Sequence, residues 1–293
     1  MVIPNIWQLF FNGLGLSAFY ALFGVGLTLV FGVMKIINFA HGELYMLGAY
    51  FVWLVVSAGS DVLPLIPLFF LGLIVGALFI GGLGVGIERV IFRPLRVSPL
   101  SGFMASVGLL YVLQVLAGQT FGLAKKSVPT VFPGVIKLAD STISIHTIVT
   151  ILTAVILLGL LWFFLERTRL GQGVRASSQD SEAAALQGIS LNRMSAIVMG
   201  MGSVLAATAG ALVGTSFLIT PYMGWFVLWK AFIVTIVGGM GSISGAIVAA
   251  LLFGFLDNLI TSLGEPRMVT MIDVLIMLVI LAFRPQGLLG REK

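Results

Sequence analysis

The chain has 293 residues, of which 59% are hydrophobic and only 9% are charged, and its mean hydropathy is +1.14. An ordinary soluble domain carries about 25% charged residues, so this composition excludes one and indicates an integral membrane protein. The 36 glycines and the long apolar runs favour helices over an outer-membrane barrel. The absence of cysteine excludes disulfides, thiolate chemistry and cysteine-ligated metal sites.

Nine apolar stretches predict the membrane-crossing segments, because a helix needs about 20 mostly apolar residues to span a bilayer. In chain order they are 7–33, 36–57, 64–87, 101–122, 144–165, 195–217, 226–238, 243–262 and 268–283. The segments 226–238 and 243–262 are either two crossings or one re-entrant hairpin. No basic segment or cleavage site of a signal peptide accompanies the first stretch, so we expect it to be retained. The predicted fold is an all-α polytopic membrane protein with about eight or nine transmembrane or half-spanning helices.

Basic residues predict the orientation of these helices. One side of the predicted bundle carries Lys35, Arg89, Arg93, Arg96, Arg167, Arg169, Arg175, Arg193, Arg284, Arg291 and Lys293, and the other carries Lys125, Lys126, Lys137 and Arg267. By the positive-inside rule the first side is cytoplasmic, so we expect an outside N-terminus and a cytoplasmic C-terminus. We therefore interpret the net charge of +5 as a topological signal and predict no nucleic-acid partner.

Glycine is expected to cause any break inside a helix, because all ten prolines fall at segment ends or in connections. Two segments offer such breaks: NFAHGELYMLGAY at 38–50 and VGGMGSISGA at 237–246. Paired interrupted segments are typical of a translocation path. The alternative is tight helix packing, which we favour for the GxxxG pairs Gly72/Gly76, Gly82/Gly86, Gly210/Gly214 and Gly241/Gly245.

Polar residues in the two interrupted segments are the candidates for a substrate pathway. Helical spacing places Asn38, His41, Gly42, Tyr45, Gly48 and Ala49 on one small and polar face, with Glu43 beside them. From the second segment the candidates are Gly238, Gly239, Gly241, Ser242 and Ser244. Buried His and Glu side chains must find partners in any case, so the first face is either a hydrated path or a set of interhelical hydrogen bonds.

Three charged residues fall within the last apolar segments. Lys230, Asp257 and Asp273 are each placed by the predicted topology in the outer third of a segment. They form either a structural ion pair or the lining of an outer vestibule. We favour the ion pair, because a lone charge at that depth loses its hydration with nothing to offset the loss.

The polar segment 166–193 lies on the predicted cytoplasmic side. Ser177 and Asp180 resemble a capping box, helix formers follow to Gln187, and Gly188 fits a helix end. We therefore expect one short helix on the membrane surface that contacts a partner protein or packs beneath the bundle.

No motif for enzyme chemistry is found in the sequence. It contains no GxxxxGK[ST] loop and no HExxH motif, and neither His41 nor His146 has a defensible serine partner. We expect no catalytic residue, no metal site and no cofactor in this chain.

Four motifs together resemble the permease subunits of branched-chain amino-acid ABC importers of the LivH type. They are NFAHGELYMLGAY, RASSQDSEAAALQGIS, KAFIVTIVGGMGSISGA and FRPQGLLG, and their order and spacing agree with that family. The resemblance implies one permease domain over 1–293, with a periplasmic loop at 123–143 and a cytoplasmic coupling loop at 166–193. It implies as partners a second homologous permease, two cytoplasmic ATPase subunits and a periplasmic binding protein, in the bacterial inner membrane.

The same resemblance assigns residues and a substrate class. Its coupling pattern falls on Gly171, Arg175, Ala176, Asp180, Ala184 and Gly188, whereas Gln172 and Gln179 depart from it. Hydrophobic amino acids are the implied substrates. The alternatives are a urea or short-amide permease, a self-sufficient channel for small neutral solutes, and an ion-coupled carrier with Glu43 or Asp257 as its ion site.

Overall fold

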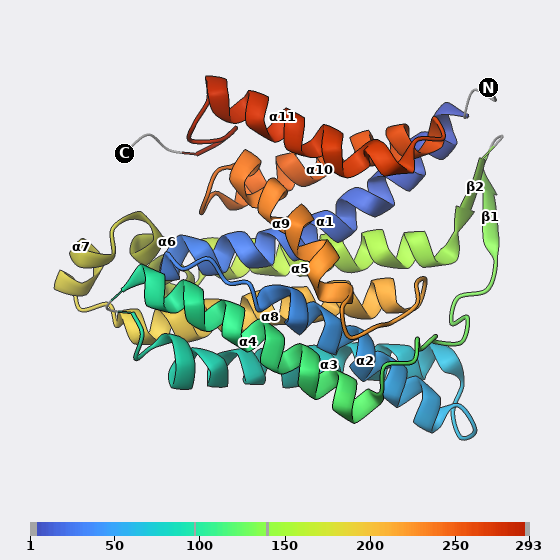
Figure 1. Cartoon of the computed structure of the whole chain (residues 1–293), viewed down its shortest axis with the longest axis horizontal. Coiled ribbons are helices and arrows are strands. Elements are labelled where there is room, and N and C mark those ends of the chain that lie inside the picture. The colour runs from blue at the N-terminus through green and yellow to red at the C-terminus, as the bar shows by residue number, and fades with distance from the viewer. Residues whose placement is uncertain (1–4, 97, 139–140, 291–293) are drawn as a thin grey trace.

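Long helices lie roughly along one axis in the computed structural model, which describes residues 5–96, 98–138 and 141–290 (Figure 1). The helices are α1 (Ile6–Met34), α2 (His41–Gly59), α3 (Leu65–Ile87), α4 (Pro99–Phe121), α5 (Ile145–Arg167), α6 (Arg169–Gln179), α7 (Ser181–Leu186), α8 (Leu191–Gly214), α9 (Met223–Gly238), α10 (Ile243–Ser262) and α11 (Val269–Phe283). A π-helical turn at Glu88–Phe92 extends α3, and a 3-10 turn at Pro266–Met268 precedes α11. The strands β1 (Val135–Leu138) and β2 (Ser141–Ser144) pair antiparallel.

Among the described residues, eight helices are long and apolar enough to cross a membrane, which confirms the predicted fold class. The ninth apolar helix, α9, has 16 residues. At 1.5 Å per residue it is about 24 Å long, shorter than a hydrocarbon core of about 30 Å. Most predicted bounds agree with the helices to within a few residues. The clearest error is α2, which begins at His41 and not at residue 36.

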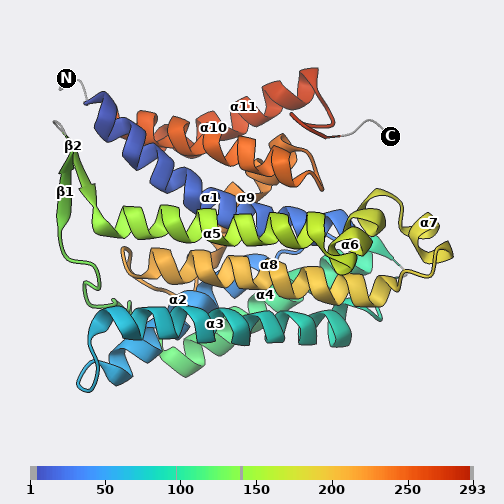
Figure 2. The same ribbon diagram turned by 180° about the vertical axis from the view of Figure 1, so that it is seen from behind.

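The bundle has two distinct ends. The start of α1 and the hairpin β1–β2 lie at one, which we call the hairpin end (Figures 1 and 2). At the other end, which we call the α7 end, lie α6, α7 and the last turn of α11 (Figure 2). The start of α1 and the last turn of α11 therefore lie at opposite ends of the bundle (Figures 1 and 2).

Small residues bring the central helices into backbone contact. A Cβ atom on Gly48 of α2 would lie 2.1 Å from the Ala207 carbonyl oxygen of α8, and one on Gly210 of α8 would lie 1.8 Å from the Tyr45 carbonyl oxygen. Any side chain at either position would separate the two helices. The packing role predicted for glycine holds here, whereas Gly82 and Gly86 of α3 face open space.

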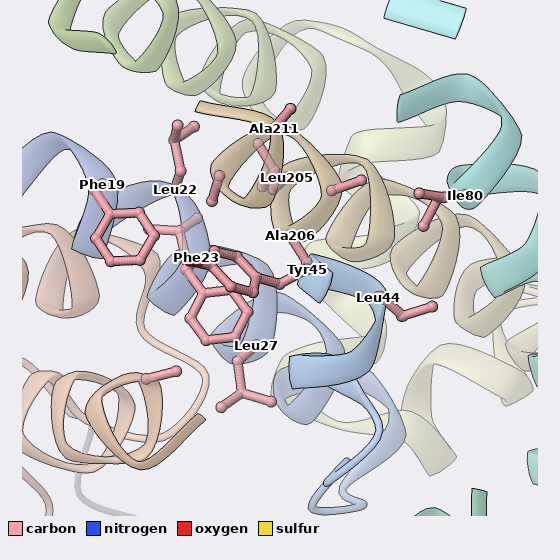
Figure 3. Close-up of a cluster of buried hydrophobic side chains, with 14 of the residues drawn as sticks. Phe19, Leu22, Phe23, Leu27, Leu44, Tyr45, Ile80, Leu205, Ala206 and Ala211 are labelled. Carbon is pink, nitrogen blue, oxygen red and sulfur yellow. The ribbon is translucent and has the colours of Figure 1, made fainter. Parts of the chain in front are cut away.

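A cluster of aromatic and aliphatic side chains fills the space between α1, α2 and α8. Figure 3 shows the α1 members of this cluster beside Tyr45 of α2 and Leu205 of α8. Phe23 and Tyr45 have ring centroids 5.3 Å apart. Because α1 and α8 are the most buried of the membrane-length helices, the bundle is organised around them.

Candidate functional site

The segment between α1 and α2, residues 35–40, is not helical, and we call it the linker. Lys35 ends α1 in the left-handed conformation (φ 54°), with its amide bonded to the Phe31 carbonyl oxygen at 2.9 Å. Asn38 forms the turn that precedes α2: its side-chain oxygen accepts from the Ala40 amide at 3.1 Å, and its carbonyl oxygen accepts from the His41 amide at 3.3 Å. The predicted helical face is therefore wrong in one respect, because Asn38 precedes the helix on which His41 lies.

The linker runs back along α1 before α2 begins (Figure 1). The His41 ring contacts Gly26, where a Cβ atom would lie 3.2 Å from Nε2. Gly26 stands eight residues before Met34, the last residue of α1, which is about 12 Å along the helix axis. The first turn of α2 therefore lies inside the bundle and not at its end.

His41 is completely enclosed at this position. Its ring stacks on Phe23 with a centroid distance of 5.0 Å and an interplanar angle of 27°. Neither ring nitrogen makes a hydrogen bond to the described residues. Gly42, next along the chain, packs against Gly224 of α9, whose carbonyl oxygen would lie 2.5 Å from a Cβ atom on Gly42.

Glu43 joins α2 to α4. Its carboxylate is fully buried. Oε1 accepts a hydrogen bond from Gln114 Nε2 at 3.0 Å, whereas Oε2 has no partner among the described residues. The Tyr45 hydroxyl is also buried without a partner there. The alternative of interhelical hydrogen bonding therefore applies to Glu43 in this conformation. All five candidates from this segment, Asn38, His41, Gly42, Glu43 and Tyr45, are buried within the chain. A pathway role for them stays a prediction.

The second interrupted segment is a tight turn between α9 and α10. Gly239 and Gly241 both adopt positive φ, 103° and 91°, which few residues other than glycine tolerate. The Ser242 hydroxyl accepts from the Gly245 amide at 3.2 Å and starts α10, and Gly241 packs on Gly32 near the end of α1. The break predicted at 237–246 is present, but it lies at the α7 end and does not meet His41.

The C-terminal segment 284–290 closes over this turn. The amides of Leu288 and Leu289 donate to the carbonyl oxygens of Val237 at 2.7 Å and Gly238 at 3.2 Å. These bonds satisfy carbonyl groups that the end of α9 would otherwise leave unpaired. Sequence reasoning missed this cap, although the glycines of the FRPQGLLG motif were a signal that the chain approaches another backbone closely.

Lys230, Asp257 and Asp273 meet, so the predicted ion pairing is confirmed and extended to both carboxylates. Lys230 Nζ lies 2.7 Å from Asp257 Oδ2 and also contacts Asp273. The Tyr20 hydroxyl of α1 donates to Asp257 Oδ2 at 2.6 Å. The prediction was wrong in placing Lys230 in the outer third of its segment, because it stands at the middle of α9. All three charged side chains are nearly or fully buried, so they do not line an open vestibule here.

The segment 166–193 forms two helices, not one. The Thr168 hydroxyl caps α6 by accepting from the Gly171 amide at 2.9 Å. Asp180 caps α7, because its Oδ1 accepts from the amides of Glu182 at 2.9 Å and Ala183 at 3.0 Å. The predicted role of Ser177 as a cap is wrong: α6 starts earlier than expected and buries Ser177 within it.

The other residues predicted for coupling hold this segment in shape. Gly171 lets α6 approach α5, since a Cβ atom there would lie 2.1 Å from the Phe164 carbonyl oxygen. Arg175 pairs with Glu166 of α5 at 2.5 Å. The Ala176 carbonyl oxygen accepts from the Asp180 amide at 3.1 Å. Ala184 is the buried residue of α7, and Gly188 follows the end of α7 with φ 81°.

The part of the segment that was expected to contact a partner protein projects outward as α7. Figure 2 shows α7 extending beyond the ends of α3, α5 and α8. Leu186, the last residue of α7, is 87% exposed, more than any other large hydrophobic residue described. It lies outside the membrane-length helices, so lipid is a poor explanation for its exposure.

A second cluster stabilises the same end of the bundle. Glu88, in the π turn after α3, is fully buried and pairs with Arg93 at 2.8 Å and with Arg96. Arg96 also donates to the Asn192 side-chain oxygen of α8 at 2.9 Å. The connection between α3 and α4 is thereby fixed to the helix that follows α7.

Comparison with known proteins places this arrangement in a family. Residues 9–282 match the model of the branched-chain amino acid transport system / permease component family. The chain belongs to this family. It is 33% identical to the high-affinity branched-chain amino acid transport system permease protein LivH of Salmonella typhimurium, with 98% of this chain and 96% of that protein covered.

Two further relatives support the assignment. The permease protein BraD of Pseudomonas aeruginosa is 33% identical over 99% of each chain. A probable branched-chain amino acid transport permease protein of Methanocaldococcus jannaschii is 27% identical over 94% of this chain and 89% of its own. No solved structure matches the chain. Together with eight membrane-length helices, the family identifies a multi-pass permease of the inner membrane that works within an ABC system.

Proposed function

We propose that this chain is one of two permease subunits in an ATP-driven importer of branched-chain amino acids. The complete importer contains a second homologous permease, two cytoplasmic ATPase subunits and a periplasmic binding protein. The observation that carries the proposal is that this chain aligns with a LivH permease over nearly the whole length of both proteins. The projecting α6–α7 segment, which could contact a partner, supports it. The 1–293 chain acts as one permease domain, with the 166–193 segment in the cytoplasm and the 123–143 segment in the periplasm.

The orientation follows from charge. The connections at the α7 end, which join α3 to α4 and α5 to α8, carry seven arginines: Arg89, Arg93, Arg96, Arg167, Arg169, Arg175 and Arg193. Positively charged connections favour the cytoplasmic side of a membrane. The N-terminus is then outside and the C-terminus inside. In this orientation Leu186 and Asp180 face the compartment in which ATP is hydrolysed.

Movement passes from α7 to the membrane helices through contacts. Arg175 joins α6 to α5 at 2.5 Å, and Lys35 Nζ donates to the Ser178 carbonyl oxygen at 3.1 Å, which joins α6 to the end of α1. A small hollow between α1, α5 and α6 is lined by Gly32, Val174 and Arg175. A displacement of α7 by the ATPase is therefore transmitted to α1 and α5, and space beside α6 permits a small rotation.

Alternating access then opens the buried polar residues at the start of α2. Small residues between α2, α8 and α9 allow their backbones to shift against one another without large side chains interlocking. Gly238, Gly239, Gly241, Ser242 and Ser244 lie at the cytoplasmic mouth of this passage in the proposed orientation. A channel or an ion-coupled carrier would not need the projecting α7.

Co-purification tests this function. The chain, its partner permease and the two ATPase subunits are co-expressed, and Leu186→Glu is compared with Gln187→Glu, a neighbouring exposed residue. We expect ATPase recovery to fall strongly for Leu186→Glu and little for Gln187→Glu, because only the first places a charge in an apolar contact. In a separate experiment, competition by urea and acetamide against leucine uptake tests the alternative of an amide permease. Equal ATPase recovery from both variants would argue against docking through α7.

A further inference from the structure

The FRPQGLLG motif ends in a segment that is bonded to the connection between α9 and α10. We call residues 284–290 the strap and residues 239–242 the turn. The amides of Leu288 and Leu289 in the strap donate hydrogen bonds, at 2.7 and 3.2 Å, to the last two carbonyl groups of α9. The strap therefore holds the backbone from which the turn begins.

Glycine brings the strap and the turn into close contact. A Cβ atom on Gly287 would lie 2.6 Å from the Gly239 amide nitrogen, and one on Gly239 would lie 2.6 Å from the Gly290 amide nitrogen. Gly287 also adopts a φ of 82°, which residues with a side chain tolerate poorly. A side chain at any of these positions would push the strap away from the turn.

The turn has little stiffness of its own. Gly239 and Gly241 supply two of its four residues, and glycine changes its backbone conformation more easily than any other residue. Among the described residues, one backbone hydrogen bond lies within the turn, from the Ser242 amide to the Gly239 carbonyl oxygen at 2.9 Å. Contacts with neighbouring segments must therefore hold the turn in its position.

The second glycine of the turn contacts the end of α1, which α6 also contacts. A Cβ atom on Gly32 of α1 would lie 3.3 Å from Gly241 Cα and 3.8 Å from Ser178 Cβ of α6. Lys35 Nζ donates to the Ser178 carbonyl oxygen at 3.1 Å. Gly32 thus lies between the segment that carries α7 and the turn, so a displacement of α6 reaches Gly241 through α1.

The strap is supported by the helix that precedes it. The one buried residue of α11, Asp273, contacts Lys230 in the middle of α9. The strap then bonds to the end of the same helix. α11 and the strap therefore hold α9 at two places, and the second of these is where the turn begins.

We propose that the strap stiffens the turn, so that movement of α6 displaces the cytoplasmic mouth of the passage. A displacement of Gly32 acts on Gly241. A free glycine turn would bend and absorb the displacement, whereas a turn bonded to the strap moves as a unit with the end of α9. The role rests on the proposed import function, and it makes the strap a positioning segment that couples ATP hydrolysis to transport.

A matched pair of glycine variants tests the strap. Gly287→Ala is compared with Gly264→Ala in the loop after α10, because Gly264 also has a positive φ, 91°, but a Cβ atom there meets open space. Each full complex, with partner permease, ATPase subunits and binding protein, is reconstituted in vesicles. The readout is the number of leucine molecules taken up per ATP hydrolysed. We expect this ratio to fall several-fold for Gly287→Ala and to stay unchanged for Gly264→Ala.

The ratio separates coupling from stability. A complex that is partly misfolded loses uptake and hydrolysis together, so its ratio stays constant. Equal ratios for Gly287→Ala and Gly264→Ala, with a lower unfolding temperature for Gly287→Ala alone, would reduce the strap to a structural cap and overturn the proposal. The unmodified complex is measured in parallel. If it shows no ATP-driven uptake, the proposed function itself fails.

A milder pair decides the matter if Gly287→Ala does not assemble. The Leu288 side chain packs against the hydrophobic core, whereas the Leu289 side chain is 50% exposed, and alanine at either position retains the amide that bonds to α9. We expect Leu288→Ala to loosen the strap and to lower the ratio of uptake to hydrolysis, and Leu289→Ala to leave it unchanged. The same ratio in both variants would contradict a coupling role.

Discussion

Helices α2 and α11 are held in the bundle in opposite ways. α2 has eleven buried residues among its 19 and touches α8 through glycine. α11 has one buried residue among its 15, and that residue is Asp273, which contacts Lys230. Apolar burial does little to join helices that already lie in lipid, so close backbone packing and polar contacts replace it. Close backbone packing therefore holds α2 in the bundle, and a polar contact holds α11.

The largest effect is expected from Lys230→Met. The change leaves the carboxylates of Asp257 and Asp273 buried without their shared cation, and breaking a buried pair in this way costs about 3–5 kcal/mol. We expect a lower thermal unfolding temperature in detergent and faster proteolysis between α10 and α11. Lys126→Met, at a lysine that lies 4.9 Å from the Trp53 ring, is the control.

A double-mutant cycle sharpens this result. Adding Asp273→Asn to Lys230→Met removes one of the stranded charges, so the second change should be less destabilising than Asp273→Asn alone. Strictly additive effects would show that Lys230 and Asp273 do not stabilise one another. The attachment of α11 would then need another cause.

An intermediate effect is expected from Gly48→Val. The new side chain begins 2.1 Å from the Ala207 carbonyl oxygen, so α2 and α8 must separate. Overpacking of this kind costs about 1–3 kcal/mol or more. Gly82→Val, where the added Cβ meets open space, is the matched control. Thermal unfolding of both variants measures the difference, and equal unfolding temperatures would reject backbone contact as the basis of α2 packing.

The smallest effect is expected at Glu43. Gln114→Leu removes the partner of the buried Oε1 atom and should destabilise by about 1–3 kcal/mol. Glu43→Gln retains an oxygen that accepts from Gln114, so it should cost less. The unfolding temperatures of the two variants are compared under identical detergent conditions. A larger loss for Glu43→Gln would show that the charge, and not the hydrogen bond, is needed.

The positions of the helices could be predicted from the sequence because hydropathy measures the same property that lipid selects. The ion pairs of Lys230 could be predicted for a related reason, since a charge in an apolar segment needs a partner. The structure differs from the prediction where backbone conformation determines the end of a helix. Lys35 ends α1 with a positive φ that no glycine announced, so the true start of α2 was missed.

The candidate site was predicted only in outline. Ser177 and Asp180 are both good capping residues, and the sequence did not show that Thr168 begins an earlier helix that absorbs Ser177. The amides of Leu288 and Leu289 cap the end of α9, about 50 residues earlier in the chain. Hydropathy does not predict backbone hydrogen bonds between segments so far apart in the sequence. The exposure of Leu186 depends on α7 projecting from the bundle, which only the three-dimensional arrangement shows.

Uptake of labelled leucine into sealed vesicles tests the central claim most directly. The chain is reconstituted either alone or with its partner permease and ATPase subunits, and ATP and the binding protein are supplied on their respective sides. We predict accumulation above the outside concentration only in the complete system with hydrolysable ATP. Uphill accumulation by this chain alone would contradict the account, because it would show that the chain supplies its own driving force.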